Sequence, residues 1–387
     1  MTIIMVFAWI CFFSFCIYSL FGHNVPTQNR KPKMTTNPQL AKRNNSISYI
    51  KGCAILGVIL IHLFDWSEIQ WSAEVKNVKE LLYPFVMLFI ATAGSLMVIA
   101  SRKYDMGIAA KRLVKRGLEI FGVYFLYNIT KLYIYNFAKQ PFYLGALDSG
   151  QLTLGNILQL KIFTVPISIL LTIAFFVVLS PLILSLLRKI KYPKAFLLFL
   201  VGVLLLVNYA FTVPSNAVTD FLYSKNYILF PLALWAVPFL LGMFLALLDL
   251  EQYKLGQIAI WGSLTIVTYS WWRYSGHSSW QPSSAMYPLH PYYIAFSFFF
   301  MFVLIAIFAK LEKYKSPFLN RILATLQVYG DNTLELYILH WLVIDLTSWL
   351  LFAYMPWIWL IMPLFFVAYS FWNRQKIDRY FQNLMSH

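Results

Sequence analysis

Long apolar stretches separated by short polar connections are the dominant pattern of this chain. A helix needs about 20 predominantly apolar residues to cross the hydrocarbon core of a bilayer, and about eleven such stretches occur among the 387 residues. The pattern therefore predicts an all-α protein, a polytopic transmembrane helical bundle of about ten core helices plus one N-terminal extra helix. The expected core spans are residues 47–64, 81–100, 117–137, 164–187, 195–211, 227–248, 258–271, 292–309, 334–352 and 357–371.

Two segments precede the core spans. The first apolar run, residues 3–21, has no basic region before it and no evident small-residue cleavage site, so we interpret residues 1–22 as a membrane anchor and not as a removed signal peptide. Residues 23–45 are basic and polar and are expected to form a flexible linker. The ten-helix domain is expected at residues 46–373, followed by a cytoplasmic tail at residues 374–387.

Charge is scarce and unevenly distributed along the chain. Charged residues make up 12% of the sequence, compared with roughly 25% in soluble domains. The formal net charge of +16 comes from Lys and Arg that gather in the loops after the second, fourth, eighth and tenth spans, as expected of cytoplasmic loops. The loop after the sixth span, where Lys254 stands near Asp249 and Glu251, fits this alternation least well. This distribution predicts a multi-pass plasma-membrane protein with a cytoplasmic C-terminus, and it argues against nucleic-acid binding.

The connection between the seventh and eighth spans is rich in aromatic residues. We expect it on the outer side of the membrane, and its composition suits stacking on sugar rings and hydrogen bonding to hydroxyls. An interfacial belt of aromatic residues explains the same composition equally well. The residues concerned are Trp272, Arg273, Tyr274, His277, Trp280, Tyr287 and His290.

The first core span carries two ionisable groups on one helix face. Lys51 and His62 are eleven residues apart, so they point in directions within roughly 20° of each other and lie about 16 Å apart along the axis. Ionisable groups inside apolar spans are costly and therefore functional candidates. Lys51 is placed to meet the phosphates of an acyl-CoA entering from the cytoplasm, and His62 to act as a general base. Asp65 is placed to orient the imidazole or to balance its charge. A snorkelling lysine and an interfacial histidine are the alternative interpretation.

Residues 49–62 resemble the opening helix of the transmembrane acyltransferases of acyltransferase family 3, which O-acylate cell-surface glycans. The motif of that family is an arginine, ten residues and then a histidine required for activity, which the resemblance places at His62. Lys51 stands where the family has arginine, which keeps the cation but not the bidentate phosphate geometry. The resemblance covers about ten spans from Ser46 onward, and it implies an acyltransferase that uses acyl-CoA as its donor.

Two more segments resemble parts of the same family. Residues 89–96 resemble the small-residue turn of its second helix, although Ala93 occupies the position of the usual Ser before Gly94. Residues 111–119 resemble the basic segment that leads into the third helix, which implies that Arg112, Lys115 and Arg116 lie near the CoA phosphates. A positive-inside topology signal is the alternative interpretation of this segment.

Residues 330–340 resemble a late helix of the family, with Thr333 in place of its usual Ser. The resemblance and the apolar setting imply that Glu335, Tyr337 and His340 line the reaction cavity. Satisfied hydrogen bonds between helices explain the two ionisable groups equally well.

The predicted function is therefore an integral membrane acyltransferase that moves an acyl group, most simply acetyl from acetyl-CoA, to a hydroxyl of a cell-surface or exported carbohydrate. The expected partners are acyl-CoA, the carbohydrate acceptor and the lipid bilayer. No permanently bound cofactor is expected, and no metal, because the three cysteines lack metal-ligand spacing. The predicted catalytic residues are His62 and Asp65. The predicted donor site consists of Lys51, Arg112, Lys115 and Arg116, and the residues predicted to line the cavity are Glu335, Tyr337, His340 and Trp235.

Two alternatives to this function remain open. The branch that resembles heparan glucosaminide N-acetyltransferase shares features with residues 62–65, 115–117 and 231–242, the last of which contains Trp235. A glycan transporter or flippase also places charged groups at membrane depth, and its broken helices often come in inverted repeats. No convincing repeat relates the two halves of the chain, although Pro166, Pro231 and Pro238 are candidates for helix interruptions.

Overall fold

The computed structural model describes residues 45–66, 69–138, 153–158, 160, 167–210, 217–223, 230–248, 250–277, 279–287, 289–314, 316–351 and 357–386. Throughout these residues the regular elements are helices. The predicted N-terminal anchor and nearly all of the predicted linker lie outside the described residues.

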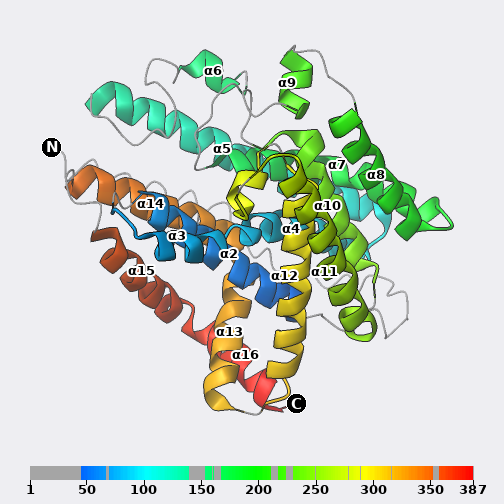
Figure 1. Cartoon of the computed structure of the whole chain (residues 1–387). Helices are drawn as coiled ribbons and strands as arrows, with labels where there is room; N and C mark the ends of the chain where they lie inside the picture. Colours follow the sequence, from blue (N-terminus) through cyan, green and yellow to red (C-terminus); the bar gives the residue numbers. More distant parts are fainter. Residues whose placement is uncertain are drawn as a thin grey trace.

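Each of the ten predicted core spans coincides with a helix, which confirms the all-α fold (Figure 1). Helix α5 begins eleven residues before its predicted span, and α11 begins eight before, because both extend into polar sequence. The ten helices are α2 (Asn45–Trp66), α4 (Pro84–Ser101), α5 (Met106–Ala138), α7 (Ser168–Lys189), α8 (Pro193–Ala210), α10 (Leu232–Ala246), α11 (Leu250–Tyr274), α12 (Pro291–Leu311), α14 (Thr333–Leu351) and α15 (Ile358–Trp372).

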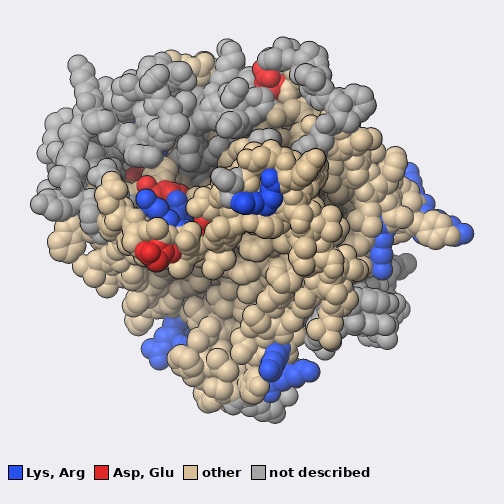
Figure 2. Space-filling model, in the orientation of Figure 1, with Lys and Arg blue, Asp and Glu red and all other residues tan. Residues whose placement is uncertain are grey.

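Four helical segments within the described ranges are long and apolar enough to cross a membrane: α2, the continuous segment Ala73–Ser101 that contains α3 and α4, α7 and α12. Figure 2 shows one face of the molecule, where Lys and Arg lie at the lower end, at the right edge and, together with Asp and Glu, in the upper half, and a broad area between the upper and lower groups carries no charged side chain. Such a surface suits contact with lipid, because charged groups at the bilayer centre are costly.

Helix α2 lies at the centre of the bundle, in contact with α4, α12, α13 and α14 (Figure 1). Its approach to α13 (Pro317–Asp331) depends on two glycines. A Cβ atom on Gly52 would overlap the carbonyl of Leu326, and one on Gly330 would overlap the carbonyl of Ser48. The two backbones therefore meet directly, as is common where small residues line a contact between membrane helices.

A second close crossing joins α4 to α10. A Cβ atom on Gly94 would overlap the carbonyl of Phe239, and one on Gly242 would overlap the carbonyl of Ala91. Next to Gly94, the Ser95 hydroxyl donates a 2.7 Å hydrogen bond to the Gly242 carbonyl. The small-residue segment singled out in the sequence thus serves helix packing here.

Several shorter helices were not predicted from hydropathy because they are amphipathic or brief. On the side where basic loops gather, α13 packs against α16 (Arg374–Ser386), which occupies the predicted tail. Ala324, Val328 and Ile377 form the apolar contact between them, and Arg321 pairs with Asp378. The other unpredicted helices are α3 (Ala73–Glu80), α6 (Leu154–Leu158), α9 (Ala217–Tyr223) and the 3-10 helix η4 (Pro282–Ala285).

Candidate active site

The site centres on two histidines from different helices. His62 lies near the end of α2, and His340 lies in the first half of α14, which packs against α2. Nδ1 of His62 is 3.0 Å from Nε2 of His340. The rings are nearly parallel, with centroids 5.3 Å apart and an angle of 5° between their planes. A pair of residues 278 positions apart in sequence is thus joined by a hydrogen bond between imidazoles.

The surroundings of the two rings fix their tautomers. Nδ1 of His340 is 3.2 Å from the carbonyl oxygen of Leu336, one turn earlier on α14. A carbonyl only accepts hydrogen bonds, so this nitrogen carries the proton, and a neutral His340 presents a lone pair at Nε2. Nδ1 of His62 must then be the donor between the rings. The remaining nitrogen of His62, Nε2, is left with a lone pair, which is the form that a general base requires.

Aromatic side chains enclose this pair. The ring of Trp341 is 4.4 Å from that of His62 and 4.6 Å from that of Trp66. Tyr337 meets His340 edge to face at 5.2 Å. His340 and Trp341 are 0% exposed, whereas His62 is partly exposed. Of the two imidazoles, His62 is therefore the more exposed, and His340 is fully enclosed.

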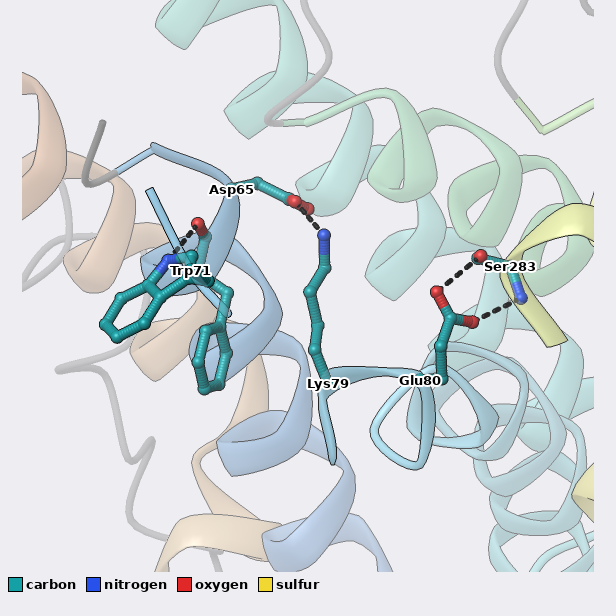
Figure 3. A network of polar contacts seen from close by, with 6 residues as sticks. Asp65, Trp71, Lys79, Glu80 and Ser283 are labelled. Carbon is teal, nitrogen blue, oxygen red and sulfur yellow. Dashed lines mark hydrogen bonds and ion pairs between the residues drawn. The ribbon is translucent and has the colours of Figure 1, made fainter. Parts of the chain in front are cut away.

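Asp65 does not take the ring-orienting position considered for it from the sequence. Its carboxylate forms an ion pair with Lys79 of α3, at the exposed end of α2 (Figure 3). Three residues beyond His62, this carboxylate faces α3 at the C-terminal end of α2, and His340 supplies the contact at Nδ1 instead. Trp71 reinforces the same end by donating from its indole nitrogen to the Phe64 carbonyl, at 3.2 Å.

The aromatic connection between α11 and α12 is held by Glu80, the residue that follows Lys79. The buried Glu80 carboxylate accepts hydrogen bonds from the backbone N–H and the hydroxyl of Ser283 in η4, at 3.0 and 2.7 Å (Figure 3). In this connection the rings of Trp272 and His277 stack with centroids 3.5 Å apart. The exposed Tyr274 and His277 leave part of this aromatic surface accessible.

His290, at the end of the same connection, caps α12. Its Nδ1 accepts a 3.1 Å hydrogen bond from the backbone N–H of Tyr292. Burial, and secondarily the nearby His277, lowers the pKa of His290 to about 4. The neutral form that can accept this bond is therefore the native form at neutral pH.

The predicted donor cations are divided between two helices. Lys51 lies in the first half of α2 and is partly exposed, while Arg112, Lys115 and Arg116 lie near the start of α5. Helix α4 packs against both α2 and α5. The Arg112 guanidinium lies 4.0 Å from the centre of the Tyr104 ring, and Arg116 pairs with Glu119 at 3.0 Å.

The other predicted cavity residues do not all share one location. Tyr337 belongs to the histidine cluster, as described above. Glu335 lies near Tyr369 of α15 and Lys376 of α16, towards the basic end of the bundle. Trp235 is fully buried in a separate aromatic cluster, where its ring is 4.8 Å from that of Phe230 and 6.4 Å from that of Tyr293. Among the described residues, no cluster of three or more His, Cys, Asp or Glu could hold a metal ion.

Sequence reasoning missed a buried polar triad formed by Tyr127, Lys131 and Asp345. Lys131 and Asp345 form an ion pair at 3.0 Å with exposed fractions of 2% and 4%. The signal was present, since both residues are ionisable and lie inside predicted spans, which makes each a functional candidate.

In the described residues, a bundle of helices, four segments of which are long and apolar enough to cross a membrane, encloses a pair of hydrogen-bonded imidazoles, which is the architecture of an integral membrane protein. The chain belongs to the family of the acyltransferase domain, acyltransferase family 3, which matches residues 44–372. The resemblance drawn from the sequence is thereby confirmed at the level of an acyltransferase, and the heparan glucosaminide branch is not distinguished from it. No curated protein and no solved structure matches the chain.

Proposed function

We propose that this membrane acyltransferase moves an acyl group, most simply acetyl, from cytoplasmic acyl-CoA to a hydroxyl of a cell-surface or exported carbohydrate. The observation that carries the proposal is the partly exposed His62, hydrogen-bonded through Nδ1 to the buried His340 at 3.0 Å. Such an imidazole has its basic nitrogen defined and its other nitrogen occupied, as a general base for acyl transfer needs.

In the proposed reaction, Nε2 of His62 takes the proton of the acceptor hydroxyl while that oxygen attacks the thioester carbonyl. A carbon–oxygen bond forms and the carbon–sulfur bond breaks, so the thiolate of CoA leaves. His62 then returns its proton to the sulfur, which yields an ester and free CoA without net proton uptake. The hydrogen bond to His340 stabilises the imidazolium that exists between these steps.

The two substrates are proposed to arrive from opposite sides. Lys51, Arg112, Lys115 and Arg116 lie towards the ends of α2 and α5 that the positive-inside rule assigns to the cytoplasm, where CoA phosphates are available. The outer connection offers Tyr274, which is 92% exposed, and the stacked His277 to a sugar. Asp65, which is paired with Lys79, has no part in the proposed proton transfer.

The test follows labelled acetyl-CoA with membranes that contain wild type or His62→Ala and measures label in surface glycan. Loss of the base is expected to lower labelling by about 10²- to 10⁴-fold. The control is Phe199→Ala, which removes an exposed ring on α8, a helix that packs against α7 and α10 and carries none of the proposed site residues. Equal labelling by wild type and His62→Ala would remove His62 from the mechanism. Movement of glycan without any labelling would favour the flippase.

A further inference from the structure

Helix α5 carries a stripe of buried polar side chains in its second half. Tyr124, Tyr127, Asn128 and Lys131 recur at the spacing of one helix face, and all four are 0–2% exposed. An apolar face would be expected on a helix buried within a membrane bundle. A lysine at such a position is costly and needs a partner.

That partner is Asp345 of α14. Nζ of Lys131 is 3.0 Å from Oδ1 of Asp345, and the Tyr127 hydroxyl donates to Oδ2 of the same carboxylate at 2.5 Å. Nζ of Lys131 also lies 5.1 Å from the centre of the Tyr127 ring. The three side chains therefore close a triangle, in which each contacts the other two.

The triangle joins two parts of the bundle that have other main packing partners. Helix α5 packs mainly against α7, and α14 packs against α2 and α15. Asp345 comes five residues after His340 on α14, which is about 7.5 Å along the helix axis. A contact that fixes Asp345 therefore also limits how far His340 can rotate or slide relative to its surroundings.

Stability alone is a weak explanation for such a triangle. Replacing a buried ion pair by apolar residues of similar size is often neutral or stabilising, because burying charge costs about as much as the pair returns. An ion pair does, however, favour one arrangement of its two helices, whereas apolar contacts between helices tolerate small shifts. The 3.0 Å contact between His62 and His340 is the feature that depends most on a single arrangement of the helices, because a small shift of α14 would break it.

We propose that the triad of Tyr127, Lys131 and Asp345 is a positioning device that holds α14 so that Nε2 of His340 meets Nδ1 of His62. The proposal rests on the acyltransferase function proposed above. The triad does not touch the reacting atoms and acts through His340. Because α5 also carries Arg112 and Arg116 at its other end, the same helix would place the donor phosphates and align the base.

The primary test is the double variant Lys131→Met/Asp345→Leu, which replaces both charges by apolar groups of similar length and leaves no unpaired charge. Tyr127→Phe is the second variant, since it removes one hydroxyl and keeps the ring, so it decides the test should the double variant not fold. The control is Thr347→Val, because the Thr347 hydroxyl, also buried on α14, bonds to the carbonyl of Val343 one turn earlier. Each purified protein is assayed for kcat and KM with acetyl-CoA and for thermal unfolding.

In the triad variants, displacement of the histidine pair is expected to lower kcat by up to about 100-fold, since a misplacement of about 1 Å has effects of that size. The KM for acetyl-CoA and the unfolding temperature are expected to stay unchanged. A second readout is the rate at which diethyl pyrocarbonate modifies His62, followed by mass spectrometry, which does not depend on turnover. A change of about threefold or more in either direction supports the positioning role. Wild-type kcat and wild-type His62 reactivity in both triad variants overturn it. Should wild type transfer no acetyl at all, acetyl-CoA is excluded as the donor in the proposed function, and the modification rates still decide the role of the triad.

Discussion

Replacing His340 with Phe is expected to lower kcat about 10- to 100-fold while leaving KM for acetyl-CoA nearly unchanged. The phenyl ring keeps the bulk of a side chain that is 0% exposed, but it removes the acceptor that Nδ1 of His62 uses at 3.0 Å. When His62 takes a proton, this hydrogen bond becomes one from a charged group, which contributes about 1.5–3 kcal/mol. At about 1.4 kcal/mol for each factor of ten in rate, the loss corresponds to the stated range.

The assay measures initial rates of transfer from labelled acetyl-CoA by purified protein in lipid nanodiscs. His340→Gln is the matched variant, because its amide oxygen can again accept from His62. We expect it to recover part of the rate that the Phe variant loses. A Phe variant with the kcat of wild type, or a Gln variant no faster than Phe, would show that the bond between the rings plays no part in the chemical step.

Further predictions concern packing and pH. Gly94→Ala and Gly242→Ala are each expected to lower the unfolding temperature, because the added methyl meets a backbone carbonyl, whereas Gly202→Ala, with open space at its Cβ position, should not lower it. The free energy of unfolding of wild type is expected to fall as pH is lowered from 6.5 towards about 4. Over that range His290 binds a proton in the unfolded chain but stays neutral in the native cap, because its native pKa is about 4. His290→Asn keeps an N-cap acceptor without a titratable ring, so unfolding curves of this variant should lack that part of the pH dependence. An equal acid response in both proteins would contradict this assignment.

The sequence was a good guide to the spanning helices and a poor one to the short helices between them. Apolar runs long enough to cross a membrane predict α2, α7 and α12 directly. Helices such as α3 and α16 alternate polar and apolar residues and depend on tertiary packing for their form. Hydropathy averaged over a long window does not detect them.

The histidines illustrate the same limit within the candidate site. The spacing from Lys51 singled out His62, and the late-helix resemblance singled out His340, but neither pattern indicated that the two rings meet. That contact depends on how α2 and α14 cross, which is a property of the whole bundle. The partner of Asp65 was hidden for the same reason, because Lys79 belongs to a helix that hydropathy did not predict.

Lys79 and Glu80 are neighbours in sequence, yet they bind opposite neighbours of α3: the end of α2 and the η4 turn. Adding one residue between them would turn the second side chain by about 100° around the helix axis, so only one of the two attachments could survive. The direct succession of these two residues is therefore fixed by the two attachments, whereas residues added nearer the start of α3 would leave both attachments in place.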